Sequence, residues 1–317
     1  MGTVAGKRKL GLPETRPAHS AAIYTYVQHF ETYRTRPVCM SHNLICHADN
    51  LQVLGDVPNA SVHLVYIDPP FNTGKTRVYT RTKTTANETG DRTGFGGNRF
   101  QTTKLGTHKF EDTFDDFLGF LEPRLAELWR VLTPDGSLFI HLDPHEVHYV
   151  KVLLDQMFGR DKFINEIIWS YDYGGRPKNR WPAKHDTILW YVKSPEQYTF
   201  NYDEIDRIPY MAPSLVGAEK AERGKTPTDV WWNTIVPTNS KERVGYPTQK
   251  PLSILNRIVR VHSNPGDVML DCFAGSGTTG EAAVRNERNF VLIDSSLDAC
   301  KVMAARLAFA SPRRMNF

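Results

Sequence analysis

Two short loops contain the residue types most suited to chemistry. The first loop follows the apolar segment 62–67 and combines a carboxylate, two prolines and an aromatic ring: Asp68, Pro69, Pro70 and Phe71. The second follows the apolar segment 268–272 and consists mainly of small residues: Phe273, Ala274, Gly275, Ser276, Gly277 and Thr278. Prolines hold neighbouring groups rigidly, and glycines admit a ligand against bare backbone. The pair predicts group transfer to a planar ring.

The second loop also satisfies the dinucleotide fingerprint G-x-G-x-x-G, through Gly275, Gly277 and Gly280. Asp294 follows about 20 residues after the first glycine, where a ribose-binding acid belongs. The apolar segment 290–294 supplies the strand that this acid should end. These features predict a nucleoside site. A dehydrogenase is disfavoured, because only 23 residues follow Asp294 and nothing resembles a hydride-transfer site.

The remaining strands of this sheet must therefore come from the first half of the chain. Segments 62–67 and 137–142 are short, apolar and rich in β-branched or aromatic residues, and each precedes an acid, Asp68 or Asp143. Helical periodicity follows at 114–132, 147–157, 253–261, 278–284 and 297–309. This alternation predicts an α/β fold with a mostly parallel sheet and helices on both faces.

Three segments, taken in this order, resemble the amino-group DNA methyltransferases in their circularly permuted, beta-class arrangement. The catalytic motif is matched by Ile67-Asp68-Pro69-Pro70-Phe71-Asn72-Thr73-Gly74-Lys75, and the S-adenosylmethionine motif by Asp271-Cys272-Phe273-Ala274-Gly275-Ser276-Gly277-Thr278-Thr279. Between them lies Pro247-Thr248-Gln249-Lys250-Pro251, similar to the family segment that closes over the methionine end of the cofactor. The resemblance implies a Rossmann-like S-adenosylmethionine-dependent methyltransferase fold, as one catalytic domain over residues 1–317.

The resemblance also implies roles for individual residues. The catalytic residues would be Asp68, Pro69, Pro70 and Phe71. The cofactor-binding residues would be Asp49, Lys250, Asp271, Phe273, Ala274, Gly275, Ser276, Gly277, Thr278 and Asp294. Within this set, Asp49 is expected near the adenine and Asp294 at the ribose hydroxyls. Asp49 is equally well placed to be a helix N-cap or a turn acid.

The chemistry of an exocyclic amine explains the catalytic residue types. The amine lone pair is delocalised into the base, so the Asp68 carboxylate and the Pro69 carbonyl are expected to accept both amine hydrogens and redirect the lone pair. Phe71 is expected to stack on a base flipped out of the duplex. No cysteine follows a proline, which disfavours methylation of cytosine carbon. In the family that this sequence resembles, Asp rather than Ser tends to open the Pro-Pro motif of adenine-N6 enzymes, so the resemblance favours adenine N6 over cytosine N4. An inactive DNA-binding relative is a further alternative, and RNA or a free metabolite is a disfavoured substrate.

Two segments concentrate basic residues. Residues 73–110 contain eight Lys or Arg against Glu88 and Asp91, and predict a long mobile loop that closes over DNA, or else a disordered insert. Residues 170–246 mix basic, aromatic and amide groups and predict a target-recognition insertion. Trp231 and Trp232 within it suit either recognition or a local core. The expected DNA-binding residues are Lys75, Arg77, Arg176, Lys178 and Arg180.

Length and composition agree with an intracellular enzyme, and the resemblance implies an enzyme of the prokaryotic cytoplasm that associates with the nucleoid. The chain has 317 residues, 40% of them hydrophobic, and a formal net charge of +4. Four scattered cysteines imply neither a disulfide framework nor a metal site, and His141 is expected to be a satisfied strand residue rather than a metal ligand. The sequence contains no apolar run of about 18 residues, so no membrane span is predicted. The expected partners are double-stranded DNA, a separate restriction endonuclease and a second copy of the chain; the recognition sequence stays open.

Overall fold

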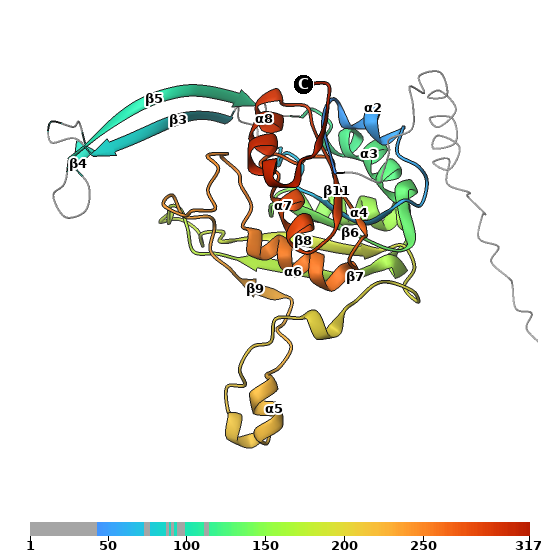
Figure 1. The fold of residues 1–317 in the computed structure, drawn as a ribbon. Coiled ribbons are helices and arrows are strands. Elements are labelled where there is room, and N and C mark those ends of the chain that lie inside the picture. Colours follow the sequence, from blue (N-terminus) through green and yellow to red (C-terminus); the bar gives the residue numbers. More distant parts are fainter. Residues whose placement is uncertain (1–42, 73–76, 87–88, 90–91, 94–98, 111–113) are drawn as a thin grey trace, which may run out of the picture. The chain divides into compact units, whose positions relative to one another are not determined.

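The computed structural model describes residues 43–317, apart from 73–76, 87–88, 90–91, 94–98 and 111–113. A nine-stranded sheet forms the centre, in the order β12-β1-β11-β10-β2-β6-β8-β7-β9 (Figure 1). Its strands are β1 (Leu44–His47), β2 (Val62–Ile67), β6 (Leu132–Leu142), β7 (Phe163–Ser170), β8 (His185–Val192), β9 (Val230–Trp232), β10 (Val268–Asp271), β11 (Asn289–Asp294) and β12 (Arg313–Met315). The strands predicted at 62–67, 137–142, 268–272 and 290–294 are confirmed as β2, β6, β10 and β11.

The sheet is parallel except for one strand. β8 pairs antiparallel with both β6 and β7, and every other neighbouring pair is parallel. Parallel strands are buried on both faces and therefore consist of near-continuous apolar runs. In β2, all residues except His63 are fully buried. The predicted α/β fold with a mostly parallel sheet is thus confirmed.

Helices cover the two faces of the sheet. On one face lie α2 (Asn50–Leu54), α3 (Phe117–Val131) and α4 (Val147–Phe158), and on the other lie α6 (Leu252–His262), α7 (Thr278–Arg285) and α8 (Leu297–Arg306) (Figure 1). Successive strand side chains point to opposite faces. In β2, Val65 and Ile67 therefore pack with α3 and α4, whereas Leu64 and Tyr66 pack with α6 and α7. All five predicted helices are present.

A crevice must form where β2 and β10 lie side by side. The chain leaves β2 toward β6 and leaves β10 toward β11, in opposite directions along the sheet. Such a switch point is where open α/β sheets bind ligands, beyond the carboxyl ends of the strands. The two strands pair only at Met269 with Leu64 and Leu270 with Val65. The loops that follow them, at Asp68 and Cys272, therefore begin where the strands no longer pair.

The segment predicted as a mobile loop contains a second sheet. β3 (Arg77–Ala86) pairs antiparallel with β5 (Arg99–Phe110), and β5 pairs with β4 (Arg92–Thr93). The expectation of an irregular segment is therefore wrong for these residues. The sequence lacks apolar periodicity there, but it is dense in threonine, whose branched side chain favours strands. Closure over DNA stays a prediction.

The predicted insertion at 170–246 is not one continuous segment. β8 lies within it and belongs to the central sheet, and β9 pairs with β7. Outside these strands, the predicted insertion consists of the loop 171–184, the segment 193–229, which contains α5 (Ala218–Arg223), and the segment 233–246. Short 3-10 turns complete the chain: Arg160–Lys162, Tyr202–Glu204, Pro213–Leu215 and Ala308–Ala310. Within the described residues, no helix has both the length and the apolar character needed to cross a bilayer.

Candidate active site

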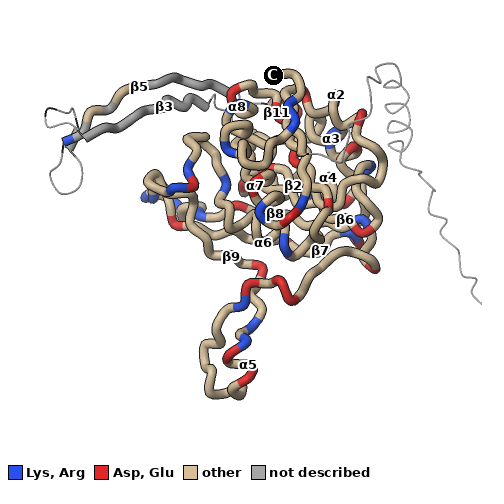
Figure 2. The backbone as a smooth tube through the Cα atoms, viewed as in Figure 1, with Lys and Arg blue, Asp and Glu red and all other residues tan. Residues whose placement is uncertain are grey.

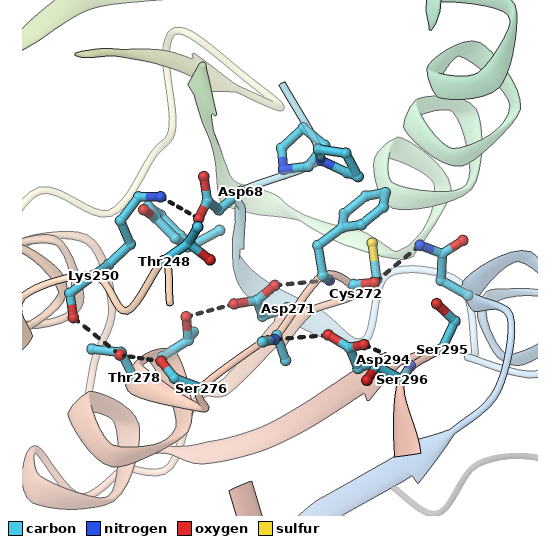
Figure 3. A pocket seen from close by; sticks show the side chains of 18 of the residues that line it. Asp68, Thr248, Lys250, Asp271, Cys272, Ser276, Thr278, Asp294, Ser295 and Ser296 are labelled. Carbon is cyan, nitrogen blue, oxygen red and sulfur yellow. Dashed lines mark hydrogen bonds and ion pairs between the residues drawn. The ribbon is translucent and has the colours of Figure 1, made fainter. Parts of the chain in front are cut away.

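A pocket of about 330 Å³ opens at the switch point and gathers most of the residues singled out from the sequence (Figure 3). Pockets of this size, placed at a switch point of an α/β sheet, commonly bind small ligands. The predicted residues that line it are Asp49, Asp68, Pro69, Pro70, Phe71, Lys250, Asp271, Phe273, Ala274, Gly275, Ser276, Thr278 and Asp294. Lining residues that the sequence analysis missed include Asn50, Tyr66, Phe120, Arg124 and Tyr246.

The glycine loop has the backbone conformation that its sequence requires. Gly275 has φ +50° and Gly277 has φ +75°, both in the left-handed region that favours glycine. A Cβ on Gly277 would also lie 2.9 Å from Met303 Cγ of α8. Gly277 does not line the pocket but precedes the first turn of α7. Its role is to shape the turn that presents Gly275 and Ser276.

Asp294 is held by backbone donors at the end of β11. The Gly275 amide donates to one carboxylate oxygen and the Ser296 amide donates to the other, each at 2.8 Å (Figure 3). Burial raises the pKa of Asp294, and these two hydrogen bonds oppose that rise. The carboxylate is therefore fixed in orientation, and an oxygen with two lone pairs can still accept from a hydroxyl of a ligand.

Asp271 ends β10 beneath the glycine loop and is 3% exposed. The Phe273 amide donates to its Oδ1 at 3.0 Å and the Thr279 hydroxyl donates to its Oδ2 at 2.6 Å. Burial raises the pKa of Asp271 to about 7, and the negative charges of Asp68 and Asp294 contribute to the rise. Among the described residues, four acids line this pocket, Asp49, Asp68, Asp271 and Asp294, together with two basic residues, Arg124 and Lys250. Arg124 pairs with Asp49 and Lys250 pairs with Asp68, so Asp271 and Asp294 are the acids left to face a cationic ligand.

Asp49 performs the N-cap role and also lines the pocket. Its Oδ1 accepts from the Leu51 amide at 2.9 Å, and its Oδ2 accepts from Arg124 Nη2 at 3.1 Å. Arg124 is buried, and its Nε also donates to Asn50 Oδ1 at 2.6 Å. Asn50 in turn donates to the Cys272 carbonyl at 2.9 Å. This chain links α3 to the loop after β10, so Arg124 positions the acid at one end of the pocket.

The catalytic loop is fastened just after its aromatic residue. Asn72 has φ +52°; its side-chain Nδ2 donates to Glu146 Oε1, and its side-chain Oδ1 accepts from the Phe114 backbone amide, both at 2.9 Å. Asp68 itself forms an ion pair with Lys250 through Oδ2 (Figure 3). Asp68 Oδ1 is buried and has no hydrogen-bond partner among the described residues. The loop therefore offers one unused carboxylate oxygen at a fixed position.

A buried hydrogen-bond network lies behind Phe71. The ring centroids of Phe71 and His141 are 6.0 Å apart. His141 is fully buried; its Nδ1 lies 2.8 Å from the Tyr66 hydroxyl, and its Nε2 donates to Asp186 Oδ2 at 3.1 Å. The Tyr171 hydroxyl donates to the other Asp186 oxygen at 3.1 Å. His141 is thus a satisfied strand residue, as predicted.

The charge state of Asp186 follows from this network. Its burial disfavours the carboxylate, but the hydrogen bond and charge of His141, the charge of Lys250 and the Tyr171 hydroxyl together lower its pKa. The network therefore holds an ionised acid close to the catalytic loop. In the described part of the chain, no three His, Cys, Asp or Glu side chains are grouped to hold a metal ion.

The predicted DNA-binding residues are distributed over two regions. Arg176, Lys178 and Arg180 are exposed on the loop between β7 and β8. Arg176 forms an ion pair of 2.5 Å with Asp172. Lys75 lies outside the described residues, and Arg77 begins β3, with a side chain that is not described. The loop starts at Tyr171, which contacts Asp186, so three exposed cations lie on a segment joined to the Phe71 site.

The two tryptophans of the predicted insertion have different surroundings. Trp231 is buried, with the Arg257 guanidinium 4.8 Å from its ring centroid. Trp232 is 72% exposed, and Trp181, on the β7–β8 loop, is 95% exposed. Trp231 therefore belongs to the core, while Trp181 and Trp232 are available to a partner.

The sheet order and the switch-point pocket define a Rossmann-like methyltransferase. The sequence profile of the DNA methylase family matches residues 62–306. The chain therefore belongs to the amino-group DNA methyltransferases, whose methyl donor is S-adenosylmethionine. It is 31% identical over 280 residues to the DNA adenine methyltransferase YhdJ of Escherichia coli, covering 84% of this chain and 83% of the relative. It is 30% identical to the type II methyltransferase M.HpaI of Haemophilus parainfluenzae, covering 84% of this chain and 74% of that one.

Solved structures with the same fold support this placement. A protein of Thermus thermophilus, solved in complex with S-adenosyl-L-methionine, matches with a TM-score of 0.52 and 25% identity over 86% of this chain and 95% of its own. The cytosine-N4-specific PvuII DNA methyltransferase matches with a TM-score of 0.58 and 14% identity, covering 90% of this chain and 98% of the other. At that identity the second likeness shows the fold alone.

Proposed function

We propose that this protein methylates the N6 amine of adenine at a specific sequence in duplex DNA. The observation that carries the proposal is the position of Asp68: its unused Oδ1 is buried in the same pocket as the glycine loop and Asp294. A hydrogen-bond acceptor for the amine and a nucleoside site thus share one pocket. The adenine specificity of the relative YhdJ favours adenine over cytosine.

The pocket residues fit S-adenosylmethionine. Its acids suit a ligand that carries a sulfonium and an ammonium group, and the Asp294 carboxylate suits a pair of ribose hydroxyls. Phe120 and Phe273, with ring centroids 6.1 Å apart, supply aromatic surface at the Asp49 end. When bound, S-adenosylmethionine supplies an electrophilic methyl group. Asp271 would face its positive charge from beneath the glycine loop.

The chain's own residues prepare the amine. Asp68 Oδ1 and the Pro69 carbonyl would accept its two hydrogens, which turns the nitrogen lone pair out of conjugation with the ring. Pro69 and Pro70 limit the movement of both acceptors. The carboxylate also stabilises the positive charge that grows on the amine. Alignment and electrostatics are then sufficient, and no covalent intermediate with the protein is needed.

The target base must leave the duplex to reach this pocket. Unpairing and unstacking a base costs about a few kcal/mol. Stacking on an aromatic ring recovers about 1–3 kcal/mol. Phe71 would provide this surface, because its ring is supported by His141 and its loop is fixed through Asn72. Arg176, Lys178 and Arg180, together with Lys75 and Arg77, would contact the phosphates, and Trp181 would contact bases.

Two alternatives lead to different products. Cytosine N4 presents the same chemistry to Asp68, and the fold is shared with a cytosine-N4-specific enzyme. An inactive DNA-binding relative would bind DNA without transfer, which the complete catalytic and glycine loops argue against. The type II relatives favour a role as the modification half of a restriction system, with a separate endonuclease acting at the same site. Homodimerisation and association with the nucleoid in the cytoplasm stay predictions.

The deciding experiment uses isotopically labelled S-adenosylmethionine and mixed-sequence duplex DNA. The product is digested to nucleosides, and the labelled nucleoside is identified by mass spectrometry. Label on N6-methyladenine is the expected result, and label on N4-methylcytosine would replace the base while keeping the mechanism. Asp68→Ala serves as the matched control. Absence of label with the wild-type protein, under conditions in which it binds the cofactor, would favour the inactive relative.

A further inference from the structure

Lys250 lies where the target amine would have to bind. Its ammonium pairs with Asp68 Oδ2, although the two residues are 182 positions apart in the sequence. The side chains are only 11% and 16% exposed, so this is not a surface ion pair. The same ammonium lies 5.1 Å from the Phe71 ring centroid. It therefore sits beside both the carboxylate and the ring that the proposed mechanism assigns to the target base.

A base amine and the Lys250 ammonium would make the same contacts. Both are nitrogen donors that a carboxylate accepts, and both can lie against an aromatic ring. Asp68 Oδ1, the oxygen proposed to accept from the amine, has no partner among the described residues, and the lysine pairs with the other oxygen. The two donors would therefore compete for the space beside Asp68 and the Phe71 ring, not for one oxygen.

Charge makes this competition stronger during transfer. Methyl transfer moves one positive charge from the sulfonium of the donor to the amine, so a second cation beside Asp68, the Lys250 ammonium, would oppose the growth of that charge on the amine. The ligand-free pocket has the reverse need, because an isolated buried carboxylate is unfavourable. Lys250 would satisfy both states: it leaves Asp68 during methyl transfer, and it pairs with Asp68 when the pocket is empty.

The lysine backbone is fixed while its side chain can move. The Lys250 carbonyl accepts from the Thr278 hydroxyl at 3.1 Å, which ties this segment to the start of α7. Thr278 is held in turn by Arg306 Nη1 at 2.8 Å. The long, flexible side chain can therefore leave Asp68 without disturbing the loop. The positive charge of Lys250 also helps to lower the pKa of Asp186.

We propose that Lys250 is a positioning residue that neutralises Asp68 in the empty pocket and must release it before the target amine can bind. This inference rests on the proposed methyl transfer to a base amine. It differs from the family-based expectation that Lys250 binds the cofactor, because it places the lysine on the amine side of the pocket. At this position the pocket would bind the uncharged exocyclic amine of the target base in place of the Lys250 ammonium.

The test compares Lys250→Met, which keeps the length without the charge, with Lys250→Arg, which keeps the charge. Duplexes carrying 2-aminopurine next to the target adenine report the flipping of that adenine by fluorescence, and calorimetry gives the Kd of the cofactor. Lys250→Met should increase the flipped fraction several-fold and lower the KM for DNA, with the cofactor Kd within two-fold of wild type. Lys250→Arg should keep the flipped fraction, the KM for DNA and the cofactor Kd close to the wild-type values. A tenfold weaker cofactor with unchanged flipping would make Lys250 a cofactor ligand and overturn the inference.

A second measurement needs neither DNA nor turnover. Asp68→Asn, Lys250→Met and the double variant are unfolded with denaturant, and the coupling between the two changes is extracted. A double variant that is more stable than the sum of the single effects supports the ion pair in solution. Strictly additive effects would overturn the inference even for an active methyltransferase. An observed coupling in a protein that labels no nucleoside would keep the pair and reject the proposed function instead.

Discussion

His141 Nε2 lies 3.1 Å from Asp186 Oδ2, which joins β6 to β8 directly behind the Phe71 ring. The pair connects two antiparallel neighbours of the sheet, and Tyr66 extends the connection into β2, the strand that ends at Asp68. Three strands are thereby fixed relative to one another at the side of the pocket where the target base is proposed to bind.

Replacing His141 should destabilise the protein and slow methyl transfer. His141→Leu leaves the Tyr66 hydroxyl and the Asp186 carboxylate buried without this partner, so the free energy of unfolding should fall by about 2–4 kcal/mol. The kcat should fall with it, because Phe71 loses its support, while the cofactor Kd stays near wild type. Tyr171→Phe removes only one hydrogen bond to Asp186 and should cost about 1 kcal/mol. Equal losses in the two variants, measured by urea unfolding, would contradict the network.

Asp68→Ala should separate methyl transfer from cofactor binding. Asp68 accepts the amine hydrogens in the proposed mechanism, whereas the acids proposed to bind the cofactor are Asp49, Asp271 and Asp294. Turnover should disappear, and cofactor affinity measured by calorimetry should stay within a few-fold of wild type. Simultaneous loss of cofactor affinity would show that Asp68 helps to bind the donor, and the division of roles would have to be abandoned.

Cofactor affinity should depend on pH through Asp271. Burial raises the pKa of this acid to about 7, and a bound cation favours its ionised form. Below pH 7 the cofactor must therefore displace a proton when it binds. Its Kd should fall by at most about tenfold per pH unit as the pH rises from 5 to 7, and should become constant above about pH 8. Asp271→Asn should remove this part of the pH dependence. A Kd that varies identically in both proteins would assign the effect to another group.

The same shift has a consequence for stability in the absence of ligand. The folded-state pKa of Asp271 lies above its unfolded value, so the folded protein binds more protons than the unfolded chain between about pH 4 and pH 7. The contribution of this group to stability is full below that window and is lost as the pH rises through 7. Asp271→Asn should flatten the stability profile there.

The sequence predicts which residues form the site better than it predicts the contacts between them. Asp68 and the glycine loop follow apolar runs of strand length, and parallel strands bring such ends to one edge, so the pocket could be located by rule. The pairing of Lys250 with Asp68 joins segments 182 positions apart and depends on how α6 and its preceding loop dock on the sheet. No local pattern encodes that contact.

The sequence did not predict the strand β8 or the pocket residue Arg124, because the pattern around each of them also fits another structure. β8 is an apolar run flanked by basic and aromatic residues, and the mixture of basic, aromatic and amide groups over the whole segment predicts an insertion there. Arg124 lies on a helix whose leucines explain its amphipathic pattern, so nothing marked it as a pocket residue. Its link to Asp49 becomes evident only when α3 packs against α2.

Gly277→Ala should test whether the loop shape controls cofactor binding. The substitution combines a φ of +75° with a Cβ 2.9 Å from Met303 Cγ, so the free energy of unfolding should fall by about 1–3 kcal/mol. Cofactor affinity should fall as well, because the turn presents Gly275 and Ser276. Gly266→Ala is the matched control: its φ is +88° but its Cβ would meet nothing within 4 Å. Unchanged cofactor affinity in Gly277→Ala would show that the loop tolerates a different turn.

Removing the exposed cations of the β7–β8 loop should change the salt dependence of DNA binding. Each lost phosphate contact should reduce the slope of log K against log salt by about 0.9. Arg180→Ala should show this reduction. Arg176→Ala should show less, because Arg176 already pairs with Asp172. Lys220→Ala on α5 is the control, since basic and acidic residues are mixed along that segment (Figure 2). If both Arg180→Ala and Lys220→Ala give the wild-type slope, the phosphates must be bound elsewhere. The hairpin β3–β5 would then be the next segment to mutate.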